Sequence, residues 1–166
     1  MAFSVGKWTQ KTCRKMIEKL HQRTQTPTPE NKTVIFTDGN DDYTYTLTDY
    51  YPETCIDYGQ LIKIREKGKV VGKVKRIVYG NPDLDDIETT DIENFNGIAR
   101  ERIGRFVRET KCFSKRKKRT ECAVHVFQFY WDFINEFKRG SSPAMSEKLV
   151  DHIWTWNEFL RYHYAV

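Results

Sequence analysis

The segment QLIKIREKGKVVGKVKRIVY, residues 60–79, constrains the fold more than any other part of the chain. Two arms rich in β-branched residues surround the turn EKGK, and this arrangement predicts a β-hairpin. Ile62, Ile64, Val74 and Ile77 are the expected inward positions, and the lysines between them would protect an exposed edge from pairing with another sheet. We therefore expect an α/β fold, with helices packed on a sheet that contains this hairpin.

Apolar spacing elsewhere predicts further strands and helices. Short apolar runs that stop at glycine predict strands over residues 2–5 and 34–38, and apolar residues at helical spacing predict helices over about 8–24, 92–108 and 119–138. In the 92–108 helix the expected core stripe is Ile92, Phe95, Ala99, Ile103 and Phe106. The 119–138 helix is aromatic nearly all round, so we expect it to be deeply buried or packed on a partner, with His125 in its core.

Length and composition indicate a soluble globular protein. The chain has 166 residues, of which 39% are hydrophobic and 31% charged. We expect one body over 1–139 and an aromatic tail over 140–166 that packs on it, since Gly-Ser-Ser-Pro breaks the chain at 140–143. The sequence contains no apolar run near the roughly 20 residues of a membrane helix and no signal-peptide pattern, so we expect a cytoplasmic protein. The four scattered cysteines, with no CxxC pair, are expected to be reduced thiols.

Positive charge is concentrated in one stretch. Residues 100–119 contain ten Lys or Arg and two Glu, a local charge of +8, whereas the whole chain carries +5 and the remaining residues therefore carry −3. The five consecutive cations at 115–119 repel one another unless something neutralises them, which favours a polyanionic partner. A solvated helix face is the alternative that charge alone leaves open.

Two carboxylates have the chemistry of a metal site. Asp38 follows a predicted buried strand, and Glu93 lies in the first turn of a predicted helix, with Asn96 and Arg100 along the same helical edge. Carboxylate oxygens suit Mg²⁺ or Mn²⁺, and two such ions about 3.5–4 Å apart clamp the attacking and leaving oxygens of a phosphoryl displacement. Spacing alone does not separate this site from two surface carboxylates, because the chain has 23 acidic residues.

An ordered series of motifs resembles one protein family. The run TDIENFNGIARERIGRFVRETKCFSKRKK (90–118) is similar to the region around the last acidic residue of DDE-type transposases from prokaryotic insertion sequences, in particular the insertion-sequence-one group. VIFTDG (34–39) resembles the strand that bears the second aspartate, and SPAMSEKLVDHIWTWNEFL (142–160) is similar to the closing segment. The resemblance spans nearly the whole chain and implies a ribonuclease H-like mixed sheet flanked by helices.

The resemblance also implies roles for particular residues. Asp38 would be the second metal-binding aspartate and Glu93 the final glutamate, while Asn96 and Arg100 would contact phosphate or position the glutamate. Mg²⁺ or Mn²⁺ would serve hydrolytic nicking at transposon ends and attack of the freed 3′-hydroxyl on target DNA. A basic run would grip the DNA backbone: Arg105, Arg108, Lys111, Lys115, Arg116, Lys117, Lys118 and Arg119.

The chain departs from the family pattern at the first aspartate. No aspartate precedes Asp38, and the only earlier acids are Glu18 and Glu30. We therefore expect the carboxyl-terminal portion of a ribonuclease H-like domain without its first strands. A site with two carboxylates should bind metal weakly. Exposed strand edges should favour a homo-oligomer or pairing with an intact transposase.

Three functional hypotheses follow from the sequence. The chain is an active transposase subunit completed by another chain, a catalytically inactive remnant that binds DNA or pairs with intact transposase as an inhibitor, or a basic structural domain without a nucleic-acid role.

Overall fold

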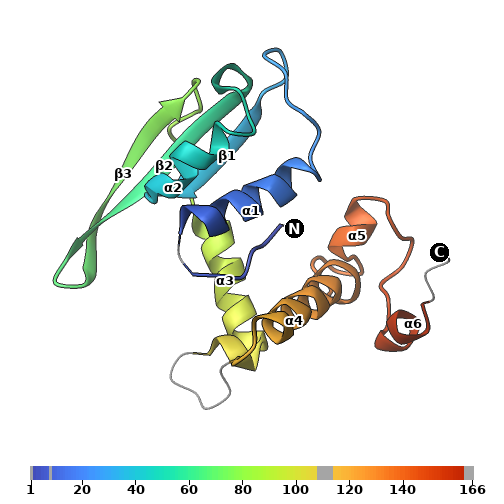
Figure 1. Ribbon diagram of the computed structural model, residues 1–166. Helices are drawn as coiled ribbons and strands as arrows, with labels where there is room; N and C mark the ends of the chain where they lie inside the picture. Colours follow the sequence, from blue (N-terminus) through green and yellow to red (C-terminus); the bar gives the residue numbers. More distant parts are fainter. Residues whose placement is uncertain (1, 8, 108–113, 163–166) are drawn as a thin grey trace. The chain divides into compact units, whose positions relative to one another are not determined.

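The computed structural model describes residues 2–7, 9–107 and 114–162, and the chain divides into two compact units (Figure 1). The amino-terminal unit is Met1–Ile98 and the carboxyl-terminal unit is Ala99–Val166. Within the described residues no helix is long and apolar enough to cross a membrane.

The amino-terminal unit is built on an open, mixed sheet of three strands in the order β1-β2-β3. β1 (Thr33–Asp38) runs parallel to β2 (Ile56–Glu66), and β2 runs antiparallel to β3 (Lys69–Tyr79). Lys67 and Gly68, which connect β2 to β3, both have positive φ, as a tight hairpin turn requires. The predicted α/β class, the hairpin and the strand at 34–38 are thus confirmed.

Helices cover one face of this sheet. α1 (Gln10–His21) and α2 (Asp41–Leu47) contribute Ile17 and Leu47 to a buried cluster. The short helix η1 (Glu53–Cys55) follows α2 and leads into β2. The other members of the cluster are Tyr51, Ile56 and Tyr58. The predicted helix at 8–24 is therefore present in shorter form, and the segment 2–5, predicted as a strand, is irregular. No described strand lies beside residues 2–5 to pair with them.

The opposite face of the sheet depends on a close approach at Gly59. A Cβ atom at this position would lie 2.6 Å from Cδ1 of Ile87, which is fully buried against β2. A glycine here lets the segment before α3 (Thr90–Arg102) pack directly on the strand.

The outer half of the hairpin is more exposed than the sequence predicts. Ile64 and Val74, which are expected to point inward, are exposed because the hairpin extends past α1 and α2 and no described element covers its far half (Figure 1). Ile77, the third of these expected inward positions, is also exposed, and it lies opposite Gly59 on the edge strand β3. Ile92, an expected core residue of α3, is exposed as well, whereas Ile103 of the same stripe is buried.

The carboxyl-terminal unit is helical. It contains the end of α3, η2 (Gly104–Phe106), α4 (Lys117–Phe129), a π-helical turn η3 (Tyr130–Ile134), α5 (Pro143–Ser146) and α6 (Trp156–Arg161). The helix predicted to reach residue 108 ends at Arg102, because Ile103 leaves the helical region with φ −99° and ψ 93°. The helix predicted over 119–138 is α4 followed by η3 and ends at Ile134.

Aromatic rings hold this unit together. Phe129 lies 4.7 Å from Phe133, 5.6 Å from Trp154 and 4.2 Å from Phe159, measured between ring centroids. The backbone of Trp154 also donates a hydrogen bond to the carbonyl of Phe133, so the tail is tied to η3. Only one side of α4 is buried, however, and His125, predicted as a core residue, is exposed. Cys13, Cys55 and Cys122 are free thiols, while Cys112 lies outside the described residues.

Gly80 offers a test of the way β3 ends. Its φ is +66°, and an added Cβ would lie 2.6 Å from the carbonyl oxygen of Ile56, a backbone atom that cannot move aside freely. We expect Gly80→Ala to lower the free energy of unfolding by about 2–4 kcal/mol, from left-handed strain plus the clash. Thermal or urea unfolding measures this change.

Two other glycines serve as controls. Gly68 has φ +81° but open space around its Cβ position, so Gly68→Ala should cost only about 1–2 kcal/mol of strain. Gly97, inside α3 with nothing within 4 Å, should gain up to about 1 kcal/mol on Gly97→Ala. An equal loss at all three positions would contradict this account.

Candidate functional site

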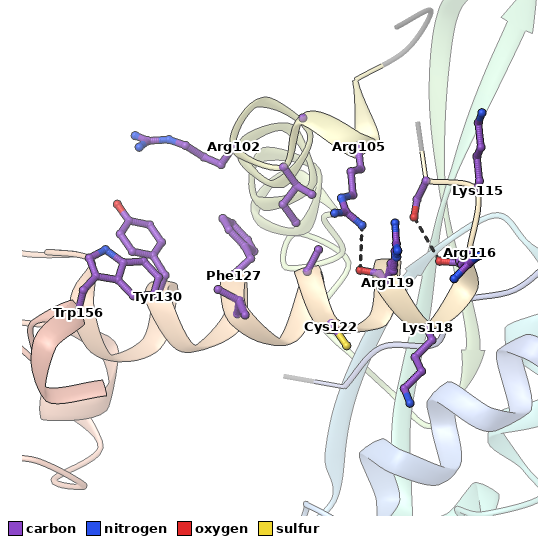
Figure 2. Close-up of a pocket in the computed structure, with 15 residues that line it drawn as sticks. Arg102, Arg105, Lys115, Arg116, Lys118, Arg119, Cys122, Phe127, Tyr130 and Trp156 are labelled. Atoms are coloured by element: carbon purple, nitrogen blue, oxygen red, sulfur yellow. Dashed lines mark hydrogen bonds between the residues drawn. The ribbon is translucent and has the colours of Figure 1, made fainter. Parts of the chain in front are cut away.

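A groove with a basic rim lies within the carboxyl-terminal unit (Figure 2). It has a volume of about 1480 Å³, and it runs beside α4 between η2 and the start of α6. We call it the basic groove. The described residues that line it carry six cations and no carboxylate: Arg102, Arg105, Lys115, Arg116, Lys118 and Arg119.

Backbone contacts fix part of the cationic rim. The guanidinium of Arg105 donates to the carbonyl of Arg119 at 3.3 Å, which ties η2 to the first turns of α4. The hydroxyl of Ser114 donates to the carbonyl of Arg116 at 3.2 Å. Both acceptors are neutral backbone oxygens, so these contacts position the rim without cancelling its positive charge.

The start of α4 adds to the positive potential. Lys117, Lys118 and Arg119 occupy its first turn, no acidic residue stands there, and the residue that precedes the helix, Arg116, makes no side-chain capping hydrogen bond. Cations at a helix amino terminus oppose the helix dipole, at a cost of typically about 0.3–1 kcal/mol each. An anion bound at this end would relieve both the dipole and the repulsion among the side chains.

Five of the eight residues predicted to bind DNA line the basic groove: Arg105, Lys115, Arg116, Lys118 and Arg119. Lys117 is not among the lining residues, and its ammonium pairs with Glu121 at 3.7 Å, one helical turn on. Arg108 and Lys111 lie outside the described residues. The prediction missed Arg102, although it belongs to the same charge-rich stretch, and it missed the aromatic end of the groove.

Asp38 lies in the amino-terminal unit, at the carboxyl end of β1, where the sequence places it. The chain turns there because the carboxylate of Asp38 accepts the backbone N–H of Asn40 at 3.2 Å, and the Asn40 side chain in turn caps α2 by accepting the N–H of Asp42 at 3.1 Å. The side chain of Asp38 is exposed. Burial, with the charge of Asp38 as a further cause, raises the pKa of nearby Tyr43 to about 12.

The buried side-chain amide of Gln60 contacts the turn between β1 and α2. Gln60 of β2 is fully buried, and its Nε2 lies within hydrogen-bond distance of the Tyr58 hydroxyl (2.7 Å), the Thr44 hydroxyl (3.2 Å) and the carbonyl of Asn40 (3.4 Å). Its Oε1 accepts from Arg76 of β3. One side chain thereby connects the β1–α2 turn to both other strands.

Glu93 contacts the hairpin. Its carboxylate pairs with the ammonium of Lys63 and accepts from the Thr89 hydroxyl at 2.7 Å. Lys63 faces Lys73 across the β2–β3 pair, so Glu93 also offsets a repulsion between two lysines. The hydrogen bonds from Lys63 and Thr89 lower the pKa of Glu93 below its ordinary value, with a smaller contribution from the charge of Lys73.

Asp38 and Glu93 lie toward the same part of the sheet but have different partners. Asp38 is paired with Leu61 in the β1–β2 register, and the partner of Glu93, Lys63, is two residues further along β2. Their described contacts direct Asp38 to the β1–α2 turn and Glu93 to the hairpin. Among the residues that the structure describes, no group of three or more His, Cys, Asp or Glu could hold a metal ion.

The other two predicted site residues lie on α3. Asn96 is exposed and follows Glu93 by nearly one turn of the helix. Arg100 is also exposed, and it belongs to the carboxyl-terminal unit.

Comparison with known proteins finds no matching family model, no matching curated protein and no matching solved structure.

The contact between Lys63 and Glu93 leads to a prediction about titration. Because the pKa of Glu93 is lowered in the folded chain, its ion pair stabilises the fold above the ordinary pKa of 4.5, and this contribution disappears as the pH falls through the lower, folded value. We expect Lys63→Met to raise the pKa of Glu93, as measured by carboxyl-carbon NMR titration. Lys73→Met should raise it less, because Lys73 acts through charge alone; equal shifts would contradict the assigned order of causes.

Proposed function

We propose that this chain is a DNA-binding protein of the DDE-transposase type, which holds the DNA backbone in the basic groove. The observation that carries the proposal is the gathering of six cations, and no described carboxylate, around one groove. Phosphate groups spaced along a strand neutralise several such charges at once, whereas a small anion neutralises one or two. The motif series that resembles insertion-sequence transposases supports the choice of DNA.

The mixed sheet is compatible with the same proposal. We propose that it is the carboxyl-terminal part of a ribonuclease H-like sheet, and the parallel β1–β2 pair with Asp38 at the carboxyl end of β1 supports this assignment. Ligands of open α/β sheets bind beyond the carboxyl ends of the strands, where this carboxylate lies.

The salt dependence of DNA binding tests the role of the groove. Each neutralised phosphate adds about 0.9 to the slope of log affinity against log salt on duplex DNA. We expect Lys115→Gln combined with Lys118→Gln to lower the magnitude of the slope by about 1.8 and to weaken binding of different sequences alike. Fluorescence anisotropy at several salt concentrations measures both effects.

Lys117→Gln is the matched control, because Lys117 adjoins Lys118 on α4 but pairs with Glu121 instead of lining the groove. It should change the slope less than Lys118→Gln does. If the two single variants lose the same affinity, net charge and not the groove explains the binding; if the unaltered chain binds no DNA, the proposal is wrong.

A second candidate function, metal-dependent strand cleavage, rests on the two carboxylates. Asp38 is exposed at a strand end, and the lowered pKa of Glu93 keeps this side chain ionised at neutral pH. Mg²⁺ or Mn²⁺ bound by such oxygens would supply Lewis-acid activation of the attacking and leaving oxygens. Lys63 would have to release Glu93 first, so the metal and the ammonium compete for one carboxylate.

Metal binding and cleavage are tested separately. If the pair is a metal site, Mn²⁺ should broaden the NMR signals of both Asp38 and Glu93, and Asp38→Asn or Glu93→Gln should abolish both this joint effect and any Mg²⁺- or Mn²⁺-dependent nicking of DNA. Robust cleavage by both variants would exclude these residues from catalysis. DNA binding that survives Glu93→Gln, with no cleavage by the unaltered chain, would instead identify a DNA-binding or transposase-pairing inhibitor.

A further inference from the structure

The basic groove changes character along α4. Cations line its first turns, and the residues that follow on the same helical stripe are small or apolar. Arg119 and Tyr130, at the two ends of this stripe, are eleven residues apart, or about 16 Å of helix. The lining residues after the cations are Cys122, Ala123, Val126, Phe127, Tyr130 and Trp156. Figure 2 shows the labelled aromatic side chains at the end of α4 opposite to Lys115 and Arg116.

Two of these aromatic rings form a flat, supported surface. The rings of Tyr130 and Trp156 are stacked, with centroids 5.9 Å apart and planes only 7° from parallel. The ring of Trp156 also contacts the ring of Phe159 edge-on, with centroids 5.9 Å apart. Trp156 is the first residue of α6, whose amino terminus is stabilised by a capping box between Thr155 and Glu158. Trp156 nevertheless remains 44% exposed, so part of a well-anchored indole is open to a ligand.

This combination fits unpaired bases better than a duplex. The outside of duplex DNA presents phosphates and sugars, and its bases stack on one another inside. A duplex backbone would use the cations but would leave Val126 and Trp156 facing charged groups. A single strand offers both phosphates for the cations and base faces for aromatic rings, which is how proteins bind single strands without sequence preference.

We propose that the basic groove binds single-stranded DNA, with phosphates at the cations of η2 and the first turns of α4 and an unpaired base stacked on Trp156. The inference rests on the proposed function, because it assigns a strand form to the DNA held by the same groove. It adds a base-contacting residue, Trp156, which the charge pattern of the sequence does not indicate.

Binding of short fluorescent oligonucleotides to the full chain tests the proposal. The probes are a single strand that cannot pair with itself, the blunt-ended duplex that it forms with its complement, and the single strand with all bases replaced by abasic sites. We expect the single strand to bind more tightly than the abasic strand by about tenfold or more, since stacking contributes about 1–3 kcal/mol per base. Both carry the same phosphates, so the difference reports base contacts alone.

Variants of Trp156 assign the contact. Trp156→Leu keeps an apolar side chain but no ring and should weaken single-strand binding by about tenfold. Trp156→Phe should retain most of the affinity, and Trp156→Leu should weaken binding of the blunt-ended duplex much less than binding of the single strand. Trp154→Phe is the control for the aromatic cluster, because Trp154 packs on Phe129 and Phe133 and does not line the groove. Far-ultraviolet circular dichroism verifies that each variant is folded.

Different failures separate the two proposals. Salt-dependent duplex binding with no loss for the abasic strand and none for Trp156→Leu would overturn this inference and leave the proposed function standing. No binding of any probe would overturn both. Tighter binding of an RNA oligonucleotide of the same sequence would overturn the choice of DNA, and a loss of duplex binding in Trp156→Leu equal to the single-strand loss would show that Trp156 only supports the fold.

Discussion

Repulsion among the cations of the basic groove is the constraint on which the carboxyl-terminal unit depends. Six positive side chains converge there, and three cations in the first turn of α4 also oppose the helix dipole. The unit compensates by packing at the opposite end of α4, where aromatic rings in contact with Phe129 hold the helix and the tail together. Aromatic packing thus stabilises one end of the helix, while positive potential is concentrated at the other, as the proposed binding of DNA requires.

The two carboxylates of the amino-terminal unit each make a contact that shapes the fold. Glu93 bridges α3 to the hairpin through Lys63, and Asp38 shapes the turn into α2. Each of these contacts is a sufficient structural reason for a carboxylate at its position. The proposed metal ion would have to replace these contacts, and it would then also remove the ion pair between Lys63 and Glu93 that joins α3 to the hairpin.

Local patterns predicted most of the architecture. The hairpin over β2 and β3, the strand that ends at Asp38 and the helix α1 all follow from apolar spacing and turn residues. Errors arose where burial depends on distant packing. Ile64 and Val74 have the alternation of a half-buried strand, yet no described element covers them, and residues 2–5 have strand-like composition without a described neighbour to pair with. Periodicity identifies an apolar face but does not show what covers it.

The sequence by itself determined the α/β class, the concentration of charge at 100–119 and the carboxylates Asp38 and Glu93 as neighbours of regular elements. Only the tertiary structure decided that five of the predicted cations line one groove, whereas Lys117 pairs with Glu121. It also decided that Lys63 pairs with the Glu93 carboxylate and that Trp156 stacks on Tyr130 from a distant part of the chain. The physical reason is that charge and propensity are local properties, whereas the partner of a side chain depends on which surfaces the packed chain brings within a few ångströms of it.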